Sequence, residues 1–225
     1  MKGRALLALG LLSLAGTPTL AQDVTVFRGA RLILGDGSPA IDNAAFVIQG
    51  DRFLATGPSG DVATPAGAAT VDLTGKTVMP AIIDAHSHIG YVKDLSTGPQ
   101  NYTRENILDH MHKFAYHGVA ASQAQGSDFG VLPYQIRDEI LAGDYPDAAR
   151  FLTAGRGFSP PDDIKNWNMR HAAYVAMSEP GVRANVQELA HWNVGLLKTW
   201  LTNRNGTVEE MPLNVFQAII DEAHA

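Results

Sequence analysis

The chain has 225 residues, no cysteine and a formal net charge of −6. That length is enough for one sizeable domain, or for one domain and a small second one. The acidic balance and the lack of a basic cluster argue against nucleic acid or an anionic membrane surface as a partner. Because there are no thiols, a bound metal ion would have to be held by His, Asp, Glu or Lys.

The first 21 residues have the features of a secretory signal peptide. Lys2 and Arg4 precede an apolar run over 5–15, and small residues lead up to Ala21. The alternative is a membrane anchor, but the run is too short to cross a bilayer. We therefore expect cleavage after Ala21, a periplasmic or secreted bacterial protein, and no membrane attachment after cleavage.

Residues 22–78 are predicted to form a small β-domain. Short alternating segments are separated by turn signals such as Asp36-Gly37 and Gly57-Pro58. We expect a small β-sandwich or partial barrel. Its predicted strands cover 24–27, 31–34, 45–48, 53–55, 70–73 and 77–78.

From about residue 79 the pattern changes to alternating strands and helices, which is typical of a parallel sheet with crossover helices. The α/β region 79–225 holds about four such units, half of the eight in a closed (β/α)₈ barrel. We therefore predict the first half of a TIM-type barrel. The predicted strands are 78–85, 119–124, 150–154 and 194–201, and the predicted helices are 104–117, 134–141, 180–191 and 213–225.

A histidine pair follows the first predicted barrel strand. Residues two apart on a strand share a face, so His86 and His88 project together. Imidazole nitrogens are preferred ligands of zinc, and barrel active sites lie at this end of the strands. The alternative is a pair of exposed or hydrogen-bonded histidines. Asp84 lies on the same face, either as an acceptor that orients an imidazole or as a helix- or turn-facing carboxylate.

Lys198 is the second candidate, because it interrupts an apolar strand pattern, Val194–Leu201. An unpaired ammonium is costly to bury, and burial favours the neutral amine. A neutral amine can take up carbon dioxide to form a carbamate, an anion able to bridge metal ions. From the spacing alone, the alternative is favoured: a salt-bridged lysine at a strand end.

The remaining histidines are not expected to bind metal. His110 and His112 are two apart in a predicted helix, where their side chains diverge. His224 belongs to the last predicted helix instead of a strand end.

Several segments resemble the metal-dependent amidohydrolase superfamily, specifically its imidazolonepropionase-like and prolidase-like branch. The most specific is the run GKTVMPAIIDAHSHIG, which resembles the family's first barrel strand with its metal-binding H-x-H. Weaker similarities run through strands two, three and four and the helix that leads to strand five. These segments are Gly118–Asp128, Ala149–Gly157, Leu196–Trp200 and Met211–His224.

The resemblance implies a divalent metal site, with zinc as the default ion, one or two ions in number, and His86, His88 and an N6-carboxylated Lys198 among the ligands. It also implies that the strand-five and strand-six histidines and the strand-eight aspartate of the family lie beyond the segments found here, so we expect a C-terminally truncated chain. Ala81 and Gly195 depart from the family pattern without touching a ligand.

The predicted function is hydrolysis of a C–N bond in a small amide, cyclic amide or dipeptide by a metal-activated water. No general base is identified, so we expect this chain alone to be inactive or nearly so. The alternatives are a half-barrel that assembles with itself or another chain, with a homo-oligomer as one form, and a non-catalytic exported binding protein.

Overall fold

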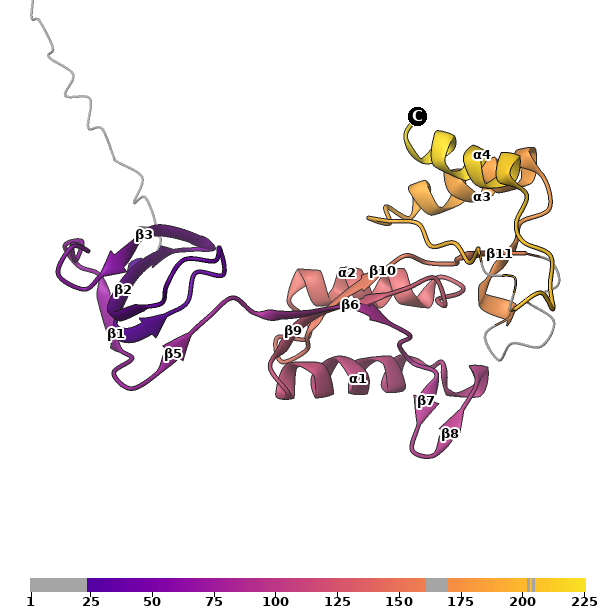
Figure 1. The fold of residues 1–225 in the computed structure, drawn as a ribbon. Coiled ribbons are helices and arrows are strands. Elements are labelled where there is room, and N and C mark those ends of the chain that lie inside the picture. Colours follow the sequence, from indigo (N-terminus) through magenta and orange to yellow (C-terminus); the bar gives the residue numbers. More distant parts are fainter. Residues whose placement is uncertain (1–23, 161–169, 202, 204) are drawn as a thin grey trace, which may run out of the picture. The chain divides into compact units, whose positions relative to one another are not determined.

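The computed structural model describes residues 24–160, 170–201, 203 and 205–225. The predicted signal peptide lies outside the described residues. The chain divides into two compact units, Met1–Pro80 and Ala81–Ala225, which are described separately (Figure 1). Within the described part of the chain, the helices are too short or too polar to cross a membrane.

The N-terminal unit is one five-stranded sheet of mixed direction. The central strand β1 pairs antiparallel with β2, and β2 with β3, while β4 and β5 pair with β1 in parallel. The described residues form this single sheet, so the predicted sandwich remains a prediction. The strands are β1 (Val24–Leu32), β2 (Ile41–Gln49), β3 (Arg52–Pro58), β4 (Ala69–Asp72) and β5 (Thr77–Val78).

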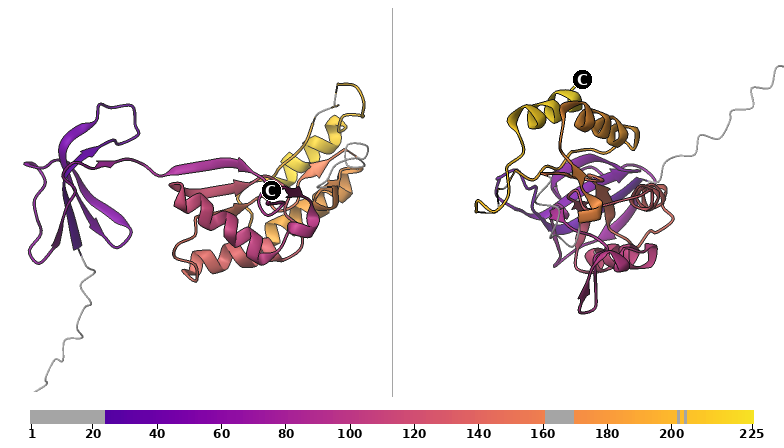
Figure 2. Two further views of the ribbon diagram at one scale, coloured as in Figure 1. Left: turned by 90° about the horizontal axis from the view of Figure 1, so that it is seen from below. Right: turned by 90° about the vertical axis from the view of Figure 1, so that its right-hand side faces the viewer.

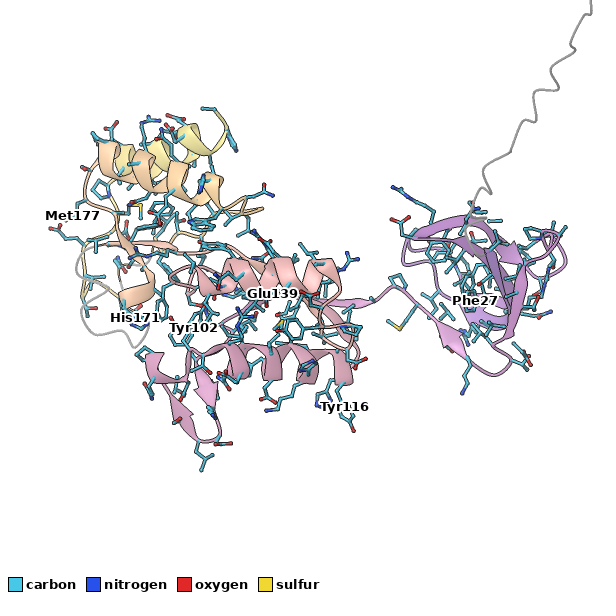
Figure 3. The ribbon with its side chains drawn as sticks, turned by 180° about the vertical axis from the view of Figure 1, so that it is seen from behind. Phe27, Tyr102, Tyr116, Glu139, His171 and Met177 are labelled. Atoms are coloured by element: carbon cyan, nitrogen blue, oxygen red, sulfur yellow. The ribbon has the colours of Figure 1, made fainter. Side chains whose placement is uncertain are left out.

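Apolar residues are buried on both sides of β2. Val47 packs with Val26 and Val62 on one side, and Phe46 packs with Leu32 on the other. The alternation of a strand sends neighbouring side chains to opposite faces, so two separate clusters result. The Phe46 ring stacks on Phe27, which is labelled in Figure 3, with centroids 4.8 Å apart.

The second unit is built on a parallel sheet of β6 (Ile82–Ser87), β9 (Val119–Ala124) and β10 (Arg150–Thr153), in the order β10-β9-β6. Helix α1 (Arg104–Tyr116) joins β6 to β9, and α2 (Leu132–Ala142) joins β9 to β10. The two predicted helices here agree with α1 and α2 to within two residues at each end. Sequential order with parallel pairing is what repeated βα units produce.

Both helices lie on the same side of this sheet, as the left view of Figure 2 shows. Ile107 and Met111 of α1 and Ile136 of α2 are fully buried, with Phe151 of β10 in the same cluster. The side chain of Thr103 caps α1 by accepting the Asn106 N–H, which satisfies one of its free N-terminal donors.

The prediction of the first barrel strand, 78–85, is wrong about where this strand begins. Val78 belongs to β5 in the N-terminal sheet, and β6 begins only at Ile82. Pro80 lies between them and has no N–H to donate to a ladder, so one continuous strand is interrupted there. Ile82 and Ile83 of β6 are 52 % and 63 % exposed.

Two short strands and two helices complete the unit. β11 (Phe158–Ser159) pairs in parallel with β12 (Tyr174–Val175). Helices α3 (Glu179–His191) and α4 (Leu213–Ala223) pack side by side in Figures 1 and 2. The smaller elements are β7 (Val92–Lys93), β8 (Ser96–Thr97), η1 (Pro99–Asn101) and η3 (Arg170–Ala172).

The predicted strand 194–201 is also wrong as a continuous strand. Only its centre pairs: Phe158 N–H donates to the Lys198 carbonyl at 2.8 Å, and Trp200 N–H to the Phe158 carbonyl at 2.9 Å. These bonds form a single parallel bridge between Phe158 and Thr199. The partner strand β11 has only two residues, so it cannot extend the ladder further. The fold is α/β, and closure into a half-barrel remains a prediction.

Candidate metal centre

The candidate residues gather at the carboxyl ends of β6 and β9. His86 is the second-to-last residue of β6, His88 directly follows this strand, and Ser127 lies three residues after β9. Gln125 N–H donates to the Ser87 carbonyl at 3.0 Å, which ties the two strand ends together. Parallel strands end at a common edge, so residues distant in sequence meet there.

The two predicted ligand histidines are close together. Their ring centroids are 5.5 Å apart and the rings are inclined by 72°. Two imidazoles bound to one tetrahedral zinc at about 2.0–2.1 Å have centroids roughly 5 Å apart. The spacing therefore fits two ligands of one ion. Across the described ranges, no third His, Asp or Glu completes a group of three, so Lys198 is the remaining candidate.

The Asp84 carboxylate contacts the end of β6 and does not contact an imidazole ring in any hydrogen bond of the described residues. One carboxylate oxygen accepts the His86 backbone N–H at 3.1 Å, and the other accepts the Ser122 hydroxyl at 3.5 Å. These contacts correspond to the turn-facing alternative, and they fix the backbone from which His86 projects.

His88 contacts a residue that the sequence analysis did not single out. Its Nδ1 lies 2.9 Å from Ser127 Oγ, and Ser127 is fully buried. Burial lowers the pKa of His88, and the charges of His86 and Lys198 lower it further. The neutral imidazole is the form that binds a metal ion, so this environment favours a ligand over a cation.

Lys198 reaches the same region because two glycines leave room for its segment. A Cβ on Gly126 would lie 2.6 Å from Lys198 Cγ, and one on Gly157 would lie 2.3 Å from the Trp200 ring. The Lys198 ammonium lies 5.5 Å from the centroid of the Trp200 ring. These two glycines follow β9 and β10, and the charge of Lys198 lowers the pKa of His88, which places Lys198 in the neighbourhood of that histidine.

A buried carboxyl next to Ser127 was also missed. Asp128 is fully buried and accepts hydrogen bonds from the hydroxyls of Tyr102, at 2.9 Å, and Thr153, at 2.5 Å. Burial raises the pKa of Asp128 to about 7, and both hydrogen bonds oppose the rise. The Gly126-Ser127-Asp128 run directly after a predicted barrel strand is the sequence signal that could have identified it.

Aromatic side chains pack beside Ser127 and Asp128. Tyr91 donates its hydroxyl to the Ser127 carbonyl at 2.6 Å, and Tyr102 stacks on Phe129 with centroids 4.5 Å apart. The His171 ring meets Phe129 edge-on at 4.6 Å. Tyr102 and His171 lie in the same region of the unit in Figure 3.

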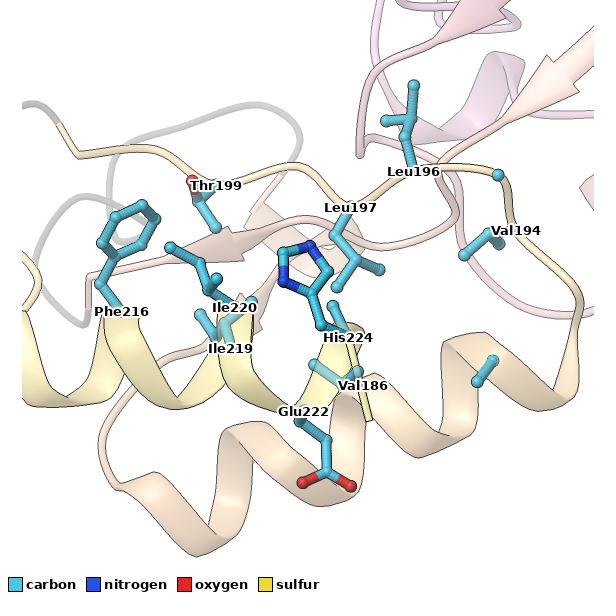
Figure 4. A pocket seen from close by; sticks show the side chains of 13 residues that line it. Val186, Val194, Leu196, Leu197, Thr199, Phe216, Ile219, Ile220, Glu222 and His224 are labelled. Carbon is cyan, nitrogen blue, oxygen red and sulfur yellow. The ribbon is translucent and has the colours of Figure 1, made fainter.

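A mostly apolar cavity of this unit lies away from the histidine pair. About 600 Å³ in volume, it lies between α3, α4 and the 194–199 segment, and neither His86 nor His88 lines it (Figure 4). Leu197 and Thr199 line it, while the neighbouring Lys198 packs on Gly126. His224 also lines this cavity, so the structure does not bring it to the histidine pair.

His110 of α1 contacts the backbone of the segment that follows β6. Its Nδ1 accepts the Gly90 N–H at 3.2 Å, and its Nε2 lies 2.9 Å from the Val92 carbonyl. The ring therefore holds the chain that follows the H-x-H run.

Sequence comparison finds imidazolonepropionases, although no protein-family model matches the chain. The protein from Streptomyces griseus is 41 % identical over 63 residues, covering 27 % of this chain and 16 % of the relative. The protein from Cereibacter sphaeroides strain KD131 is 29 % identical over 126 residues, 55 % of this chain and 29 % of the relative. The chain thus matches less than a third of the length of these curated relatives.

Solved structures share the fold over most of the chain. A Xaa-Pro dipeptidase with bound methionine superposes with a TM-score of 0.72 at 19 % identity, over 90 % of this chain and 54 % of the other. Ochratoxinase from A. niger gives 0.69 at 16 % identity, over 90 % and 53 %. The chain spans about half of these proteins. The chain is thus similar in sequence to imidazolonepropionases over part of its length, and it shares the fold of a Xaa-Pro dipeptidase and an ochratoxinase.

Proposed function

We propose that this chain carries part of the metal centre of a hydrolase that cleaves C–N bonds. The observation that supports this most is the His86–His88 pair, spaced at 5.5 Å and placed at the carboxyl end of a parallel strand. Imidazolonepropionase and Xaa-Pro dipeptidase, among the similar proteins, are named for a cyclic and a dipeptide substrate. We infer a small amide, cyclic amide or dipeptide as the substrate class.

The residues present would hold a divalent ion, with zinc as the default because the donors include two imidazoles. His86 and His88 supply two nitrogens. Lys198 supplies an oxygen once its neutral amine has added carbon dioxide to give a carbamate and a proton. When bound, such an ion supplies Lewis acidity, which polarises an amide carbonyl and acidifies water.

The chain's own groups prepare this site. Asp84 fixes the backbone of His86 by accepting its N–H, and burial lowers the pKa of His88. Gly126 and Gly157 admit the Lys198 segment. We find no general base among the described residues that lies with the pair, so we propose that these 225 residues bind metal and hydrolyse substrate weakly or not at all.

The test is a hydrolysis assay on prolyl dipeptides, a cyclic imide and an aryl amide, with and without added Zn²⁺, Mn²⁺ or Co²⁺. Activity that appears with metal and disappears in His86→Ala would support the hydrolase and refute the weak-or-inactive proposal. The matched control is His112→Ala, an exposed histidine on α1. Turnover that survives both chelation and His86→Ala would contradict the metal centre.

A second candidate is a self-assembling or binding half-barrel. Ile82 and Ile83, both more than half exposed on the edge strand β6, support it. A concentration-dependent homodimer that is lost in Ile83→Lys would favour assembly through this edge. A monomer at all concentrations would remove that argument.

We also propose export to the periplasm or exterior, from the signal-like residues 1–21. Cell fractionation of the expressed intact chain tests its location, and N-terminal sequencing of the exported protein tests cleavage after Ala21.

A further inference from the structure

We propose that Ser127 is a positioning residue for His88, holding its ring so that Nε2 is the nitrogen presented to a metal ion. This inference rests on the proposed function. The contact that supports it is between His88 Nδ1 and Ser127 Oγ, 2.9 Å apart. One ring nitrogen engaged with the protein leaves the other as the ligand, which is how ligand imidazoles are usually oriented.

Ser127 can do this because its own backbone is fixed from both sides. The Tyr91 hydroxyl donates to its carbonyl at 2.6 Å, and Asp128 N–H donates to the Gly155 carbonyl at 3.2 Å. The Asp128 carboxyl is clamped in turn by the hydroxyls of Tyr102 and Thr153. Every polar atom in this set belongs to a buried residue, so Ser127 Oγ is a fixed point against which the half-buried His88 ring rests.

A hydroxyl differs from the carboxylate that the sequence suggested for this role. A carboxylate only accepts, so it holds a ring in one tautomer, whereas a hydroxyl donates or accepts. The Ser127 contact therefore persists in both tautomers of His88: the hydroxyl donates to a bare Nδ1, or accepts from Nδ1–H once Nε2 is engaged. Ring orientation is kept while the proton moves, and Asp84 is left free to fix the His86 backbone.

The experiment compares the wild type with Ser127→Ala and Ser127→Thr, and uses Ser122→Ala as the matched control. Ser122 is also fully buried at the β6–β9 contact, but its hydroxyl bonds Ser87 and Asp84 in place of a histidine. The probe is Zn²⁺ alone, with affinity from competition with a chromophoric chelator. The ligating nitrogen is read from ¹⁵N shifts of labelled histidine.

We expect Nε2 ligation in the wild type. Ser127→Ala is expected to lose about 10–100-fold in Zn²⁺ affinity and to show mixed Nδ1 and Nε2 ligation. Ser127→Thr, which keeps the hydroxyl, is expected to retain Nε2 ligation. Ser122→Ala removes a hydroxyl that bonds Asp84 and Ser87, so it is expected to leave Nε2 ligation of His88 unchanged. Nδ1 ligation in the wild type, or unchanged affinity and nitrogen choice in Ser127→Ala, would overturn the inference.

The metal-free chain separates this inference from the proposed function. If the wild type binds no Zn²⁺ at the pair, the proposed function fails. The positioning role is then judged from His88 side-chain order by ¹³C relaxation, which should fall in Ser127→Ala and not in Ser122→Ala. If Ser127→Ala does not fold, the wild-type ligating nitrogen and Ser127→Thr decide the question.

Discussion

Replacing Gly126 by alanine should lower both the stability of the chain and its Zn²⁺ affinity. Gly130→Ala, in the same loop, is the reference for the cost of a left-handed backbone alone. Gly126 has φ +77° and is buried directly after β9. A Cβ there would lie 2.6 Å from Lys198 Cγ, 2.7 Å from Lys198 Cβ and 3.0 Å from Gly157 Cα. Two of these atoms are close to the backbone, so a simple side-chain rotation does not relieve the overlap.

Two costs add in Gly126→Ala. The left-handed backbone costs a residue with a Cβ about 1–2 kcal/mol. Forcing extra volume into a packed site adds about 1–3 kcal/mol. Gly130→Ala carries only the first cost, because Gly130 has φ +68° in the same loop and nothing lies within 4 Å of its added Cβ. We therefore expect Gly126→Ala to lose roughly 2–5 kcal/mol in the free energy of unfolding, and Gly130→Ala about 1–2.

Urea denaturation of the three proteins, followed by Trp fluorescence and far-UV circular dichroism, measures this difference. The Lys198 segment should also move away from the histidine pair in Gly126→Ala, so its Zn²⁺ affinity should fall while that of Gly130→Ala stays near the wild type. Equal losses of stability in the two variants, with equal Zn²⁺ affinity, would show that Lys198 does not pack on Gly126 and would refute the reasoning.

Three further changes test other parts of the structure. The pKa of Asp128 is raised to about 7 from an ordinary value of 3.8, so the folded state binds a proton that the unfolded state has released, and stability should fall as pH rises. Between pH 5 and 8, the free energy of unfolding of the wild type should fall by roughly 2–3 kcal/mol more than that of Asp128→Asn. Parallel pH profiles of the two proteins would contradict this. Thr103→Ala removes the cap on the Asn106 N–H of α1 and should cost about 1 kcal/mol in urea unfolding. Phe46→Ala, in the N-terminal core, should cost about 3–5 kcal/mol, whereas Phe53→Ala, 64 % exposed, should cost much less.

The sequence was most informative where local signals agree with the tertiary structure. End signals agree with α1 and α3, since Gly118 follows the first helix and Pro180 lies in the first turn of the second. The H-x-H alternation predicted two neighbouring imidazoles, and the structure brings the rings within 5.5 Å. Both inferences depend on residues a few positions apart, whose geometry the backbone alone determines.

The errors concern features that depend on long-range partners. An apolar run such as Val194–Leu201 has the composition of a strand, but a strand exists only where a partner is long enough, and β11 is not. The break at Pro80 was underestimated because the apolar pattern continues across it. Ser127 orients His88 from 39 residues away, and no local spacing rule pairs two such positions.

The central claim is that His86, His88 and Lys198 form one metal site. The most direct measurement is a Co²⁺ titration followed by visible absorption, in bicarbonate buffer, for the wild type and for His86→Ala, His88→Ala and Lys198→Ala, with His112→Ala as the control. We predict a saturable d–d band in the wild type and in His112→Ala, with its affinity lowered at least tenfold by each of the other three substitutions. A band that is unaffected by all three substitutions, or that is lost equally in His112→Ala, would contradict the account.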